Sequence, residues 1–130
     1  MSNEQKEFIG TATVEIKITR QFIEDVMETI GYAVAYWAVG SKKLEVTTDG
    51  PDFCIEEQEA STVEGIKAFV VSEESTMLGC RRVLDPAFNI RSDIRETLFG
   101  AIIEDDASNV DADVADAIAQ AAMFNELVYG

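Results

Sequence analysis

The chain has 130 residues, enough for one domain with a hydrophobic core, and its hydrophobic fraction of 47% argues against general disorder. It carries 10 Lys and Arg against 25 Asp and Glu, which gives a formal net charge of -15, and it contains no histidine. Such a charge repels the phosphates of nucleic acids, so direct nucleic-acid binding is not expected, and it attracts basic protein surfaces.

The first 19 residues predict a tail followed by a strand. Residues 1–10 begin with a polar stretch and are expected to form a flexible tail. In residues 11–19, Val14, Ile16 and Ile18 alternate with polar or charged residues, which is the period of a strand with one buried face. We therefore expect a strand over residues 11–19.

A helix is predicted over residues 20–38, where apolar side chains recur at helical spacing. Thr19 is expected to cap its start. Trp37 falls on the apolar stripe and is expected to be buried, whereas Tyr32 and Tyr36 form a ridge on the opposite side, the Tyr ridge. This ridge is expected either to be covered by the last helix or a loop, or to serve as a dimer interface or a platform for a ligand ring.

The middle of the chain predicts further strands. Residues 42–48 are typical of a strand that ends at the turn sequence Asp-Gly-Pro. Residues 51–66 are ambiguous. Residues 67–85 predict a hairpin of two strands, "KAFVVSE" and "TMLGCRRVLD", which would place Arg81 and Arg82 on opposite faces of the second strand.

Two helices are predicted near the C-terminus. The first has an apolar face around Leu98, and either Asn89 or Ser92 is expected to cap its start. The last helix is expected to begin after a cap at Asp111. The chain is thus predicted to be a single α+β domain over residues 1–130, with a small antiparallel sheet packed against the N-terminal helix and the two C-terminal helices.

The chain lacks the residues on which most catalytic and metal sites depend. Cys54 and Cys80 are far apart and have no histidine to activate them, so neither thiol catalysis nor zinc binding is expected. Asn109, Asp111 and Asp113 begin like a calcium loop, but the Gly and Glu that such a loop requires further on are absent. We therefore expect no enzyme activity, metal or cofactor. The isolated thiols, the polar start and the lack of a long apolar run predict a cytoplasmic protein that does not enter membranes.

The acidic residues gather in two tracts that contain no Lys or Arg, one between Lys43 and Lys67 and one after Arg95. Carboxylates spaced along a helix and a loop can imitate a phosphate backbone and occupy a basic nucleic-acid channel. The alternative is that they form a solvated face that favours solubility. The residues predicted to contact a partner are Glu56, Glu57, Glu59, Glu104, Asp105, Asp106, Asp111, Asp113 and Asp116.

Two arginines suggest a different site. Arg91 and Arg95 lie one helical turn apart and can grip one phosphate or carboxylate together. They can equally bridge neighbouring acids such as Asp93 or Glu96. Combined with the Tyr ridge, an arginine grip would suit a protein that holds an anionic nucleotide.

Two segments carry a pattern that resembles a known family. The predicted strand and helix end in Tyr36 and Trp37. The end of the chain carries a second pattern on Asp116, Ala117, Ile118, Gln120, Phe124, Glu126, Val128, Tyr129 and Gly130. Together these segments resemble a family of small acidic proteins encoded in phages and prophages. The resemblance implies a phage context, in which small proteins without a catalytic signature are often inhibitors of host defence.

Two functions from different classes fit these features. The first is a non-enzymatic, phage-encoded inhibitor of a host defence system, similar in role to anti-CRISPR proteins, whose acidic tracts bind a basic, nucleic-acid-binding host protein. The alternative is an oligomeric sponge that sequesters an anionic nucleotide immune signal through Arg91, Arg95 and the Tyr ridge. A homodimer is expected because the Tyr ridge and residues 123–130 offer more apolar surface than one sheet covers.

Overall fold

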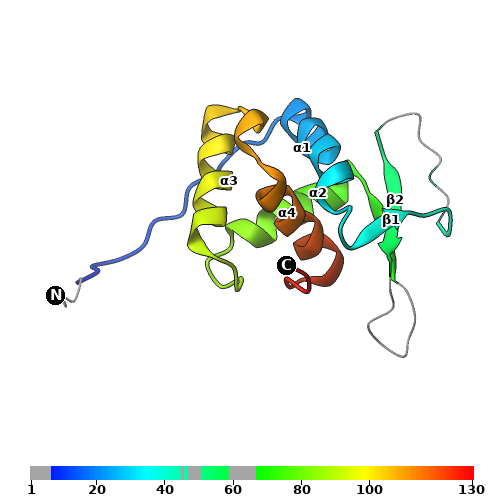
Figure 1. The fold of residues 1–130 in the computed structure, drawn as a ribbon. Helices are drawn as coiled ribbons and strands as arrows, with labels where there is room; N and C mark the ends of the chain where they lie inside the picture. The colour runs from blue at the N-terminus through cyan, green and yellow to red at the C-terminus, as the bar shows by residue number, and fades with distance from the viewer. Residues whose placement is uncertain (1–6, 45, 47–50, 59–66) are drawn as a thin grey trace.

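The computed structural model describes residues 7–44, 46, 51–58 and 67–130, which form four α-helices and a three-stranded antiparallel sheet. The predicted α+β class is confirmed. The sheet lies at one side of the helices, and the N-terminal segment leaves from the other side (Figure 1). No helix within these described ranges is long and apolar enough to cross a membrane.

Helix α1 (Arg20–Ala33) begins where the sequence predicts. Thr19 caps it by accepting a hydrogen bond from the Phe22 amide at 3.1 Å. The helix ends earlier than expected, because residues 34–37 form a turn that leads into strand β1 (Ala38–Gly40). The turn directs the Trp37 side chain into the core, where it is buried as predicted.

The sheet has the order β1-β2-β3, and both pairs of neighbours are antiparallel. Its central strand is β2 (Phe53–Glu57), and its other edge is β3 (Ala68–Val71). Ile55 of β2 faces Phe69 of β3, and Ile55 joins the buried core. The ambiguous region after residue 50 therefore supplies the middle strand.

Three strand predictions are wrong in the part of the chain that the structure describes. Residues 11–19 are extended but pair with no strand. Residues 42–44 form no strand either, while positions 45, 47 and 48 of that prediction lie outside the described residues. The second half of the predicted hairpin, from Thr76 to Asp85, lies mostly in helix α2 (Glu73–Leu84), and β3 pairs with β2 instead.

Local signals account for α2. Ser72 and Ser75 form a reciprocal cap at its start, and two glutamates occupy its first turn. Arg81 and Arg82 lie in its last turn, where positive charge suits the helix dipole. Arg81 and Arg82 are therefore neighbours on a helix and do not lie on opposite faces of a strand.

The two C-terminal helices are confirmed, and the chain continues from α2 through α3 (Ser92–Glu104), the short 3-10 helix η1 (Ala107–Asn109) and α4 (Ala112–Phe124). Asp111 caps α4 as predicted, by accepting from the Val114 amide at 3.0 Å. Arg91 occupies the cap position of α3 and forms no side-chain cap hydrogen bond. The expected cap at Asn89 or Ser92 is therefore wrong.

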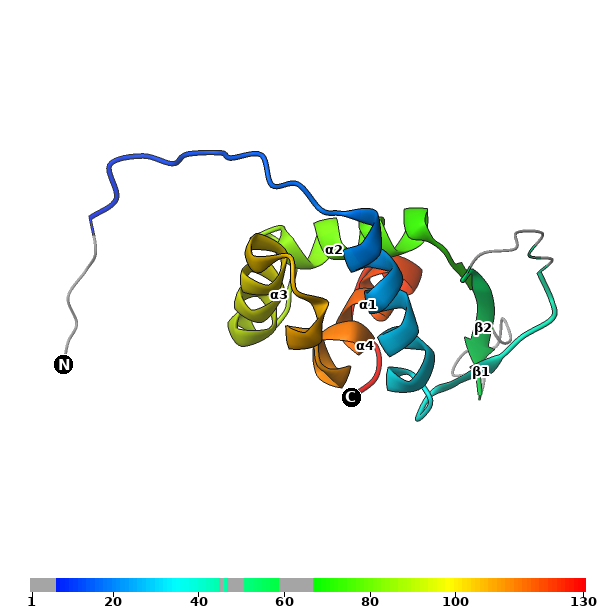
Figure 2. The ribbon, with the colours of Figure 1, turned by 90° about the horizontal axis from the view of Figure 1, so that it is seen from above.

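Helix α4 forms the centre of the fold, because it packs most extensively against α2 and next against α1 (Figures 1 and 2). Nearly all of its residues from Val114 to Met123 are buried, and many are alanines. Small side chains allow neighbouring helices to approach closely. The core thus lies around α4, and the C-terminal segment that follows α4 begins next to the sheet.

Candidate functional site

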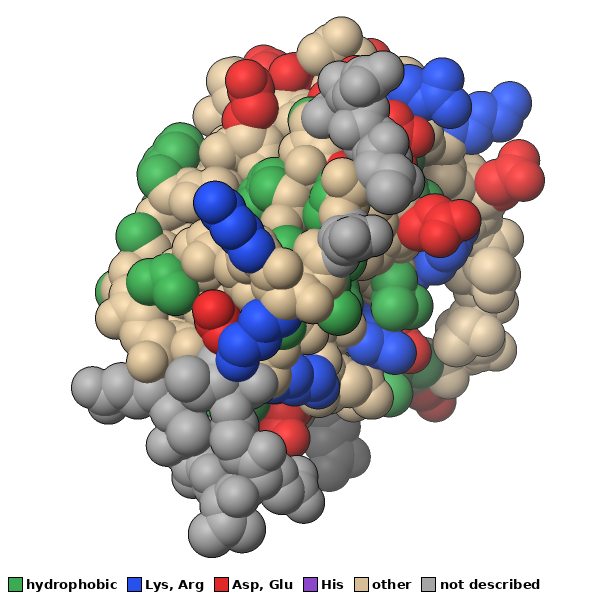
Figure 3. Space-filling model, turned by 90° about the vertical axis from the view of Figure 1, so that its right-hand side faces the viewer, with side chains coloured by type: hydrophobic (Ala, Val, Ile, Leu, Met, Phe, Trp, Pro, Cys, Tyr) green, Lys and Arg blue, Asp and Glu red, His purple; other side chains and the backbone are tan. Residues whose placement is uncertain are grey.

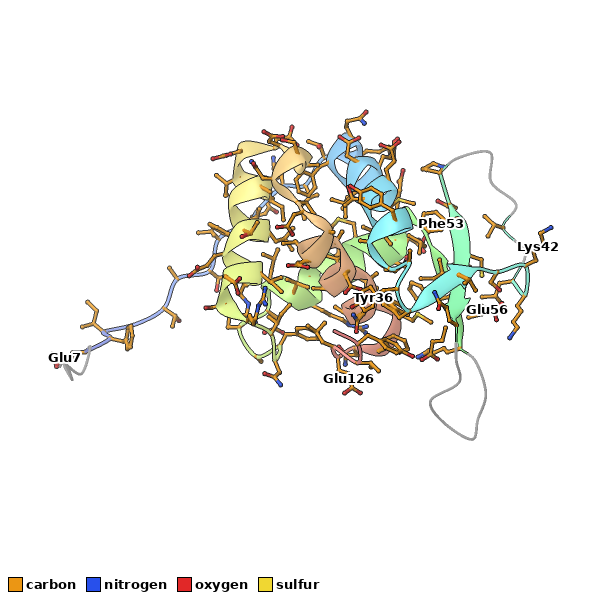
Figure 4. The ribbon with its side chains drawn as sticks, viewed as in Figure 1. Glu7, Tyr36, Lys42, Phe53, Glu56 and Glu126 are labelled. Atoms are coloured by element: carbon orange, nitrogen blue, oxygen red, sulfur yellow. The ribbon has the colours of Figure 1, made fainter. Side chains whose placement is uncertain are left out.

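Asp116 of α4 binds side chains from the turn that follows α1. Its carboxylate accepts hydrogen bonds from the Tyr36 hydroxyl, from the Trp37 indole nitrogen at 2.7 Å and from the Gln120 amide at 3.0 Å. Figure 4 shows Tyr36 lying beside α4. Asp116, one of the carboxylates predicted to contact a partner, is therefore engaged inside the protein and fixes the end of α1 on α4.

Gln120, which is 1% exposed, attaches the C-terminal segment to the same place. Its side-chain oxygen accepts hydrogen bonds from the Val128 and Tyr129 amides at 2.7 and 2.8 Å. The Tyr129 ring stacks on Trp37 with centroids 5.0 Å apart, and its hydroxyl donates to the buried Glu57 carboxylate. The turn that contains Tyr36 and Trp37 and the C-terminal segment thus contact each other. The residues of the two sequence patterns that make these contacts have structural roles.

A cavity of about 550 Å³ lies beside this network. It is lined by residues from α3, α4, the turn after α1 and the C-terminal segment, among them Tyr36, Arg91, Ile94, Asp113, Asp116 and Leu127. Two members of the predicted ligand platform, Tyr36 and Arg91, therefore meet at one cavity. Two carboxylates face the same space and oppose the binding of an anion there.

The environment of Tyr36 keeps its hydroxyl protonated. Removal of water from around the phenol, the hydrogen bond to Asp116 and the negative charge of that carboxylate together raise the pKa of Tyr36 above its ordinary value. At neutral pH the hydroxyl is thus a hydrogen-bond donor and not a base. The rings of the Tyr ridge remain accessible, since Tyr32 is 66% and Tyr36 55% exposed.

Five carboxylates are exposed where α3 ends and α4 begins, at the top of Figure 1. This acidic end consists of Glu104, Asp105, Asp106, Asp111 and Asp113. None of them forms an ion pair with a Lys or Arg of the described residues. All five belong to the set predicted to contact a partner, so the fold brings the larger part of that set together.

The backbone and its polar neighbours hold several of these carboxylates in place. Asp106 accepts from the Ser108 amide and hydroxyl at 3.0 and 2.6 Å, which lowers the pKa of Asp106 below its ordinary value. Asp105 has a left-handed backbone with φ of 52° and accepts from the Thr19 hydroxyl at 2.8 Å. With Asp111 fixed as a helix cap, the acidic end presents its charges in a defined arrangement.

The other predicted acids lie apart from the acidic end. Glu56 forms an ion pair with Lys43 at 2.8 Å, so its charge is compensated. Glu57 is buried and accepts from the Lys67 amide at 3.2 Å as well as from the C-terminal segment. Glu59 lies outside the described residues. Glu56 and Glu57 are therefore engaged within the protein.

Arg91 and Arg95 have separate partners. The Arg91 guanidinium donates to both carboxylate oxygens of Asp93, at 3.1 and 3.3 Å. Arg95 donates to the backbone carbonyls of Val83 at 2.9 Å and Phe88 at 2.7 Å, and so stabilises the end of α2. The two arginines therefore do not bind the same group: Arg91 binds a carboxylate, and Arg95 binds backbone carbonyls of the protein.

Several other bases are also used within the fold. Arg20 pairs with Glu73 at 3.2 Å. Lys67 and Arg82 donate to backbone carbonyls in the last turn of α4 at 2.8 and 2.9 Å, where positive charge suits the helix dipole. The face that bears the sheet shows Lys and Arg side chains among the acidic ones (Figure 3).

The thiols are not arranged for catalysis. Cys54 and Cys80 are both free and buried. Burial raises the pKa of the Cys80 thiol to about 12, so it stays protonated at neutral pH. In the described ranges no group of three or more metal-binding side chains converges.

Gln120 was named as part of the C-terminal pattern, but its role, which is to fix the C-terminal segment, was not predicted from the sequence. The signal in the sequence was an amide side chain within an apolar helical stripe. A side chain at such a position is buried, and a buried polar group requires hydrogen-bond partners. The partners themselves, the amides of Val128 and Tyr129, follow α4 in a segment without helix or strand. Their position could not be derived from periodicity.

Comparison with known proteins assigns this chain to no family. No protein-family model matches it, and no match was found among curated proteins or solved structures. The function must therefore be inferred from the residues and contacts of the chain itself.

Proposed function

We propose that the protein is a non-enzymatic, phage-encoded inhibitor of a host defence system, and that it binds a basic, nucleic-acid-binding host protein in the cytoplasm through the acidic end. One observation carries this proposal: five carboxylates are exposed together and have no ion-pair partner among the described residues. The net charge of -15 and the resemblance to small phage proteins support it.

The acidic end suits a basic partner for two physical reasons. Its charges attract a positive surface over a distance and so speed the encounter. Hydrogen bonds from Ser108, Thr19 and Val114 already hold three of the carboxylates, so binding costs less conformational entropy than it would for free side chains. Exposed charges on a fixed framework are what a mimic of a phosphate backbone requires.

The sponge for an anionic nucleotide is the second candidate, and the cavity that Tyr36 and Arg91 share favours it. Its support is weaker, because Asp113 and Asp116 line that cavity and Arg95 already donates to two backbone carbonyls. Release of an ultraviolet-absorbing nucleotide on denaturation of the purified protein would favour the sponge.

A pair of neutralised variants tests the inhibitor. In the first variant the acidic end is converted to amides: Glu104→Gln, Asp105→Asn, Asp106→Asn, Asp111→Asn and Asp113→Asn. Amide oxygens can keep the caps, and Asn tolerates the left-handed backbone at position 105. The control variant removes the same number of exposed carboxylates elsewhere: Glu7→Gln, Glu28→Gln, Glu74→Gln, Glu96→Gln and Glu126→Gln.

The partner is first captured from a lysate of the bacterial host on the immobilised wild-type protein and identified by mass spectrometry. Association of the purified partner with each variant is then measured by interferometry. We expect the acidic-end variant to associate at least roughly tenfold more slowly and the control to remain close to wild type. Equal slowing of both variants would show that only the net charge matters, and the assignment of the acidic end would be wrong.

A further inference from the structure

Residues 7–18, which we call the arm, form an extended segment that is bonded to nothing else in the described chain. No hydrogen bond or ion pair joins these residues to other described residues. The arm runs from the start of α1 past α2 and α3 and then beyond the helices (Figure 2). Glu7 lies at its far end, well away from the other labelled residues (Figure 4).

The arm has the properties of a strand that lacks its partner. Its backbone is extended, and its N–H and C=O groups form no hydrogen bond with the other residues that the structure describes, as the edge of an unpaired strand would. Val14, Ile16 and Ile18 lie on one face, and Ile16 and Ile18 are half-buried against the core. Val14 is 69% exposed, so the apolar face continues beyond the surface that the protein itself covers.

We propose that the arms of two copies of this chain pair as an antiparallel two-stranded ribbon centred on Ile16, and that this ribbon makes the protein a dimer. Each arm would supply the hydrogen-bond partners that the other lacks. The contact is isologous, so it closes with two copies and does not continue into a fibre. This inference is independent of the proposed inhibitory function.

The charges on the arm select this register. Centred on Ile16, the ribbon places Glu15 of each copy opposite Lys17 of the other, and Val14 opposite Ile18. The next registers that keep the apolar residues on one face would place Glu15 opposite Glu15 or Lys17 opposite Lys17. Registers between these would bring apolar residues opposite charged ones. Charge and polarity therefore both favour the same pairing.

The arm is also the place where two copies of so acidic a chain repel each other least. The protein has a net charge of -15, whereas the charged residues of the arm are only Glu7, Glu15 and Lys17. A recess of ≈ 340 Å³ lies beside Ile16, and it is lined by the apolar side chains of Leu84 and Phe99 and by Arg95 and Glu96. In a ribbon with a local two-fold axis both strands present their apolar residues to the same side, which is the side on which each arm packs against its own helices.

Charge exchange within the arm tests the register. We expect sedimentation equilibrium to show a dimer of the wild-type chain. Glu15→Lys or Lys17→Glu should raise the dissociation constant of this dimer by about tenfold, since each change creates two like-charge pairs. The double variant Glu15→Lys with Lys17→Glu restores opposite charges and should restore the dimer. Tyr32→Glu, on the Tyr ridge, should leave it intact.

Cysteine cross-linking gives a second measurement. Ile16→Cys should form a disulfide dimer on oxidation, because facing Cα atoms in a ribbon lie about 5 Å apart. Val14→Cys is the matched control, because the two Val14 positions would be about 14 Å apart along the ribbon, beyond the reach of a disulfide. The wild-type chain, with its two buried thiols, sets the background.

Three results would overturn the proposal. The first is a monomer at every concentration tested. The second is a dimer that Glu15→Lys strengthens and Lys17→Glu weakens, since general repulsion would then control association. The third is a dimer that Tyr32→Glu dissociates while the arm variants leave it unchanged, which would assign the interface to the Tyr ridge.

Discussion

Gly79 of α2 lies directly against the main chain of Ile118 in α4. A Cβ atom at position 79 would lie 2.3 Å from the Ile118 carbonyl oxygen and 2.9 Å from its side chain. The absence of a side chain at Gly79 therefore allows the two helices with the most extensive mutual contact to pack backbone to backbone. This approach places α2 against the centre of the core.

Gly79→Ala should destabilise the protein even though alanine is the better helix former. The added methyl group would meet backbone atoms that cannot move aside, at a cost of about 2 kcal/mol or more in the free energy of unfolding. Gly100→Ala is the control, because a Cβ there meets nothing within 4 Å. It should stabilise α3 by roughly 0.5–1 kcal/mol. Urea unfolding followed by circular dichroism measures both, and a stabilised Gly79→Ala protein would contradict the packing described here.

Asp116→Ala should loosen the joint between α1 and the C-terminal segment. The change removes an acceptor shared by Tyr36, Trp37 and Gln120, and should lower the free energy of unfolding by about 3 kcal/mol. It should also lower the pKa of Tyr36, which absorbance at alkaline pH can follow. Asp113→Ala, at an exposed site on the same helix, should change stability by less than about 1 kcal/mol. Equal losses in the two variants would argue against the network.

Stability should decline at alkaline pH. The pKa of Cys80 is about 12 in the folded protein, whereas the ordinary value is 9.0. Between these values the unfolded chain releases the thiol proton and the folded protein retains it, so stability is complete below about pH 9 and falls as the pH rises. The raised pKa of Tyr36 acts in the same direction. Urea unfolding at several pH values should give a shallower decline for Cys80→Ala than for the wild-type chain.

Salt should weaken binding of the partner. Raising the concentration of NaCl from about 0.05 to about 0.5 M shortens the Debye length from about 14 to about 4 Å, which screens the exposed carboxylates from a basic surface. The dissociation constant should rise steeply, mainly through slower association. A complex held equally tightly across this range would mean that the acidic end is only a solvated surface.

Local features of the fold were predictable, whereas features that depend on distant partners were not. Thr19 and Asp111 act as caps because a cap requires only the residues that follow it. The alternation in residues 11–19 predicts an extended backbone correctly, but a strand also needs a second strand, which periodicity cannot supply. For α2 the cap formed by Ser72 and Ser75 was present in the sequence and was overlooked.

The candidate site likewise has a part that could be predicted from the sequence and a part that could not. The acidic end could be predicted, because its carboxylates are close in sequence at the junction of two helices. Glu57 and Asp116 were assigned to a partner surface on charge alone, but both accept hydrogen bonds from tyrosines that are far away in the sequence. A carboxylate that binds an internal donor and one that faces solvent look the same in a sequence.

The chain contains a single tryptophan, and that residue lies at the joint between the C-terminal segment and the rest of the protein. Trp37 is stacked on Tyr129 and donates to Asp116, so the surroundings of its indole depend on whether this segment is docked. The fluorescence of Trp37 therefore reports whether the C-terminal segment is docked. A red shift in emission without loss of helical circular dichroism would identify a state in which the end of the chain has detached while the helices remain assembled.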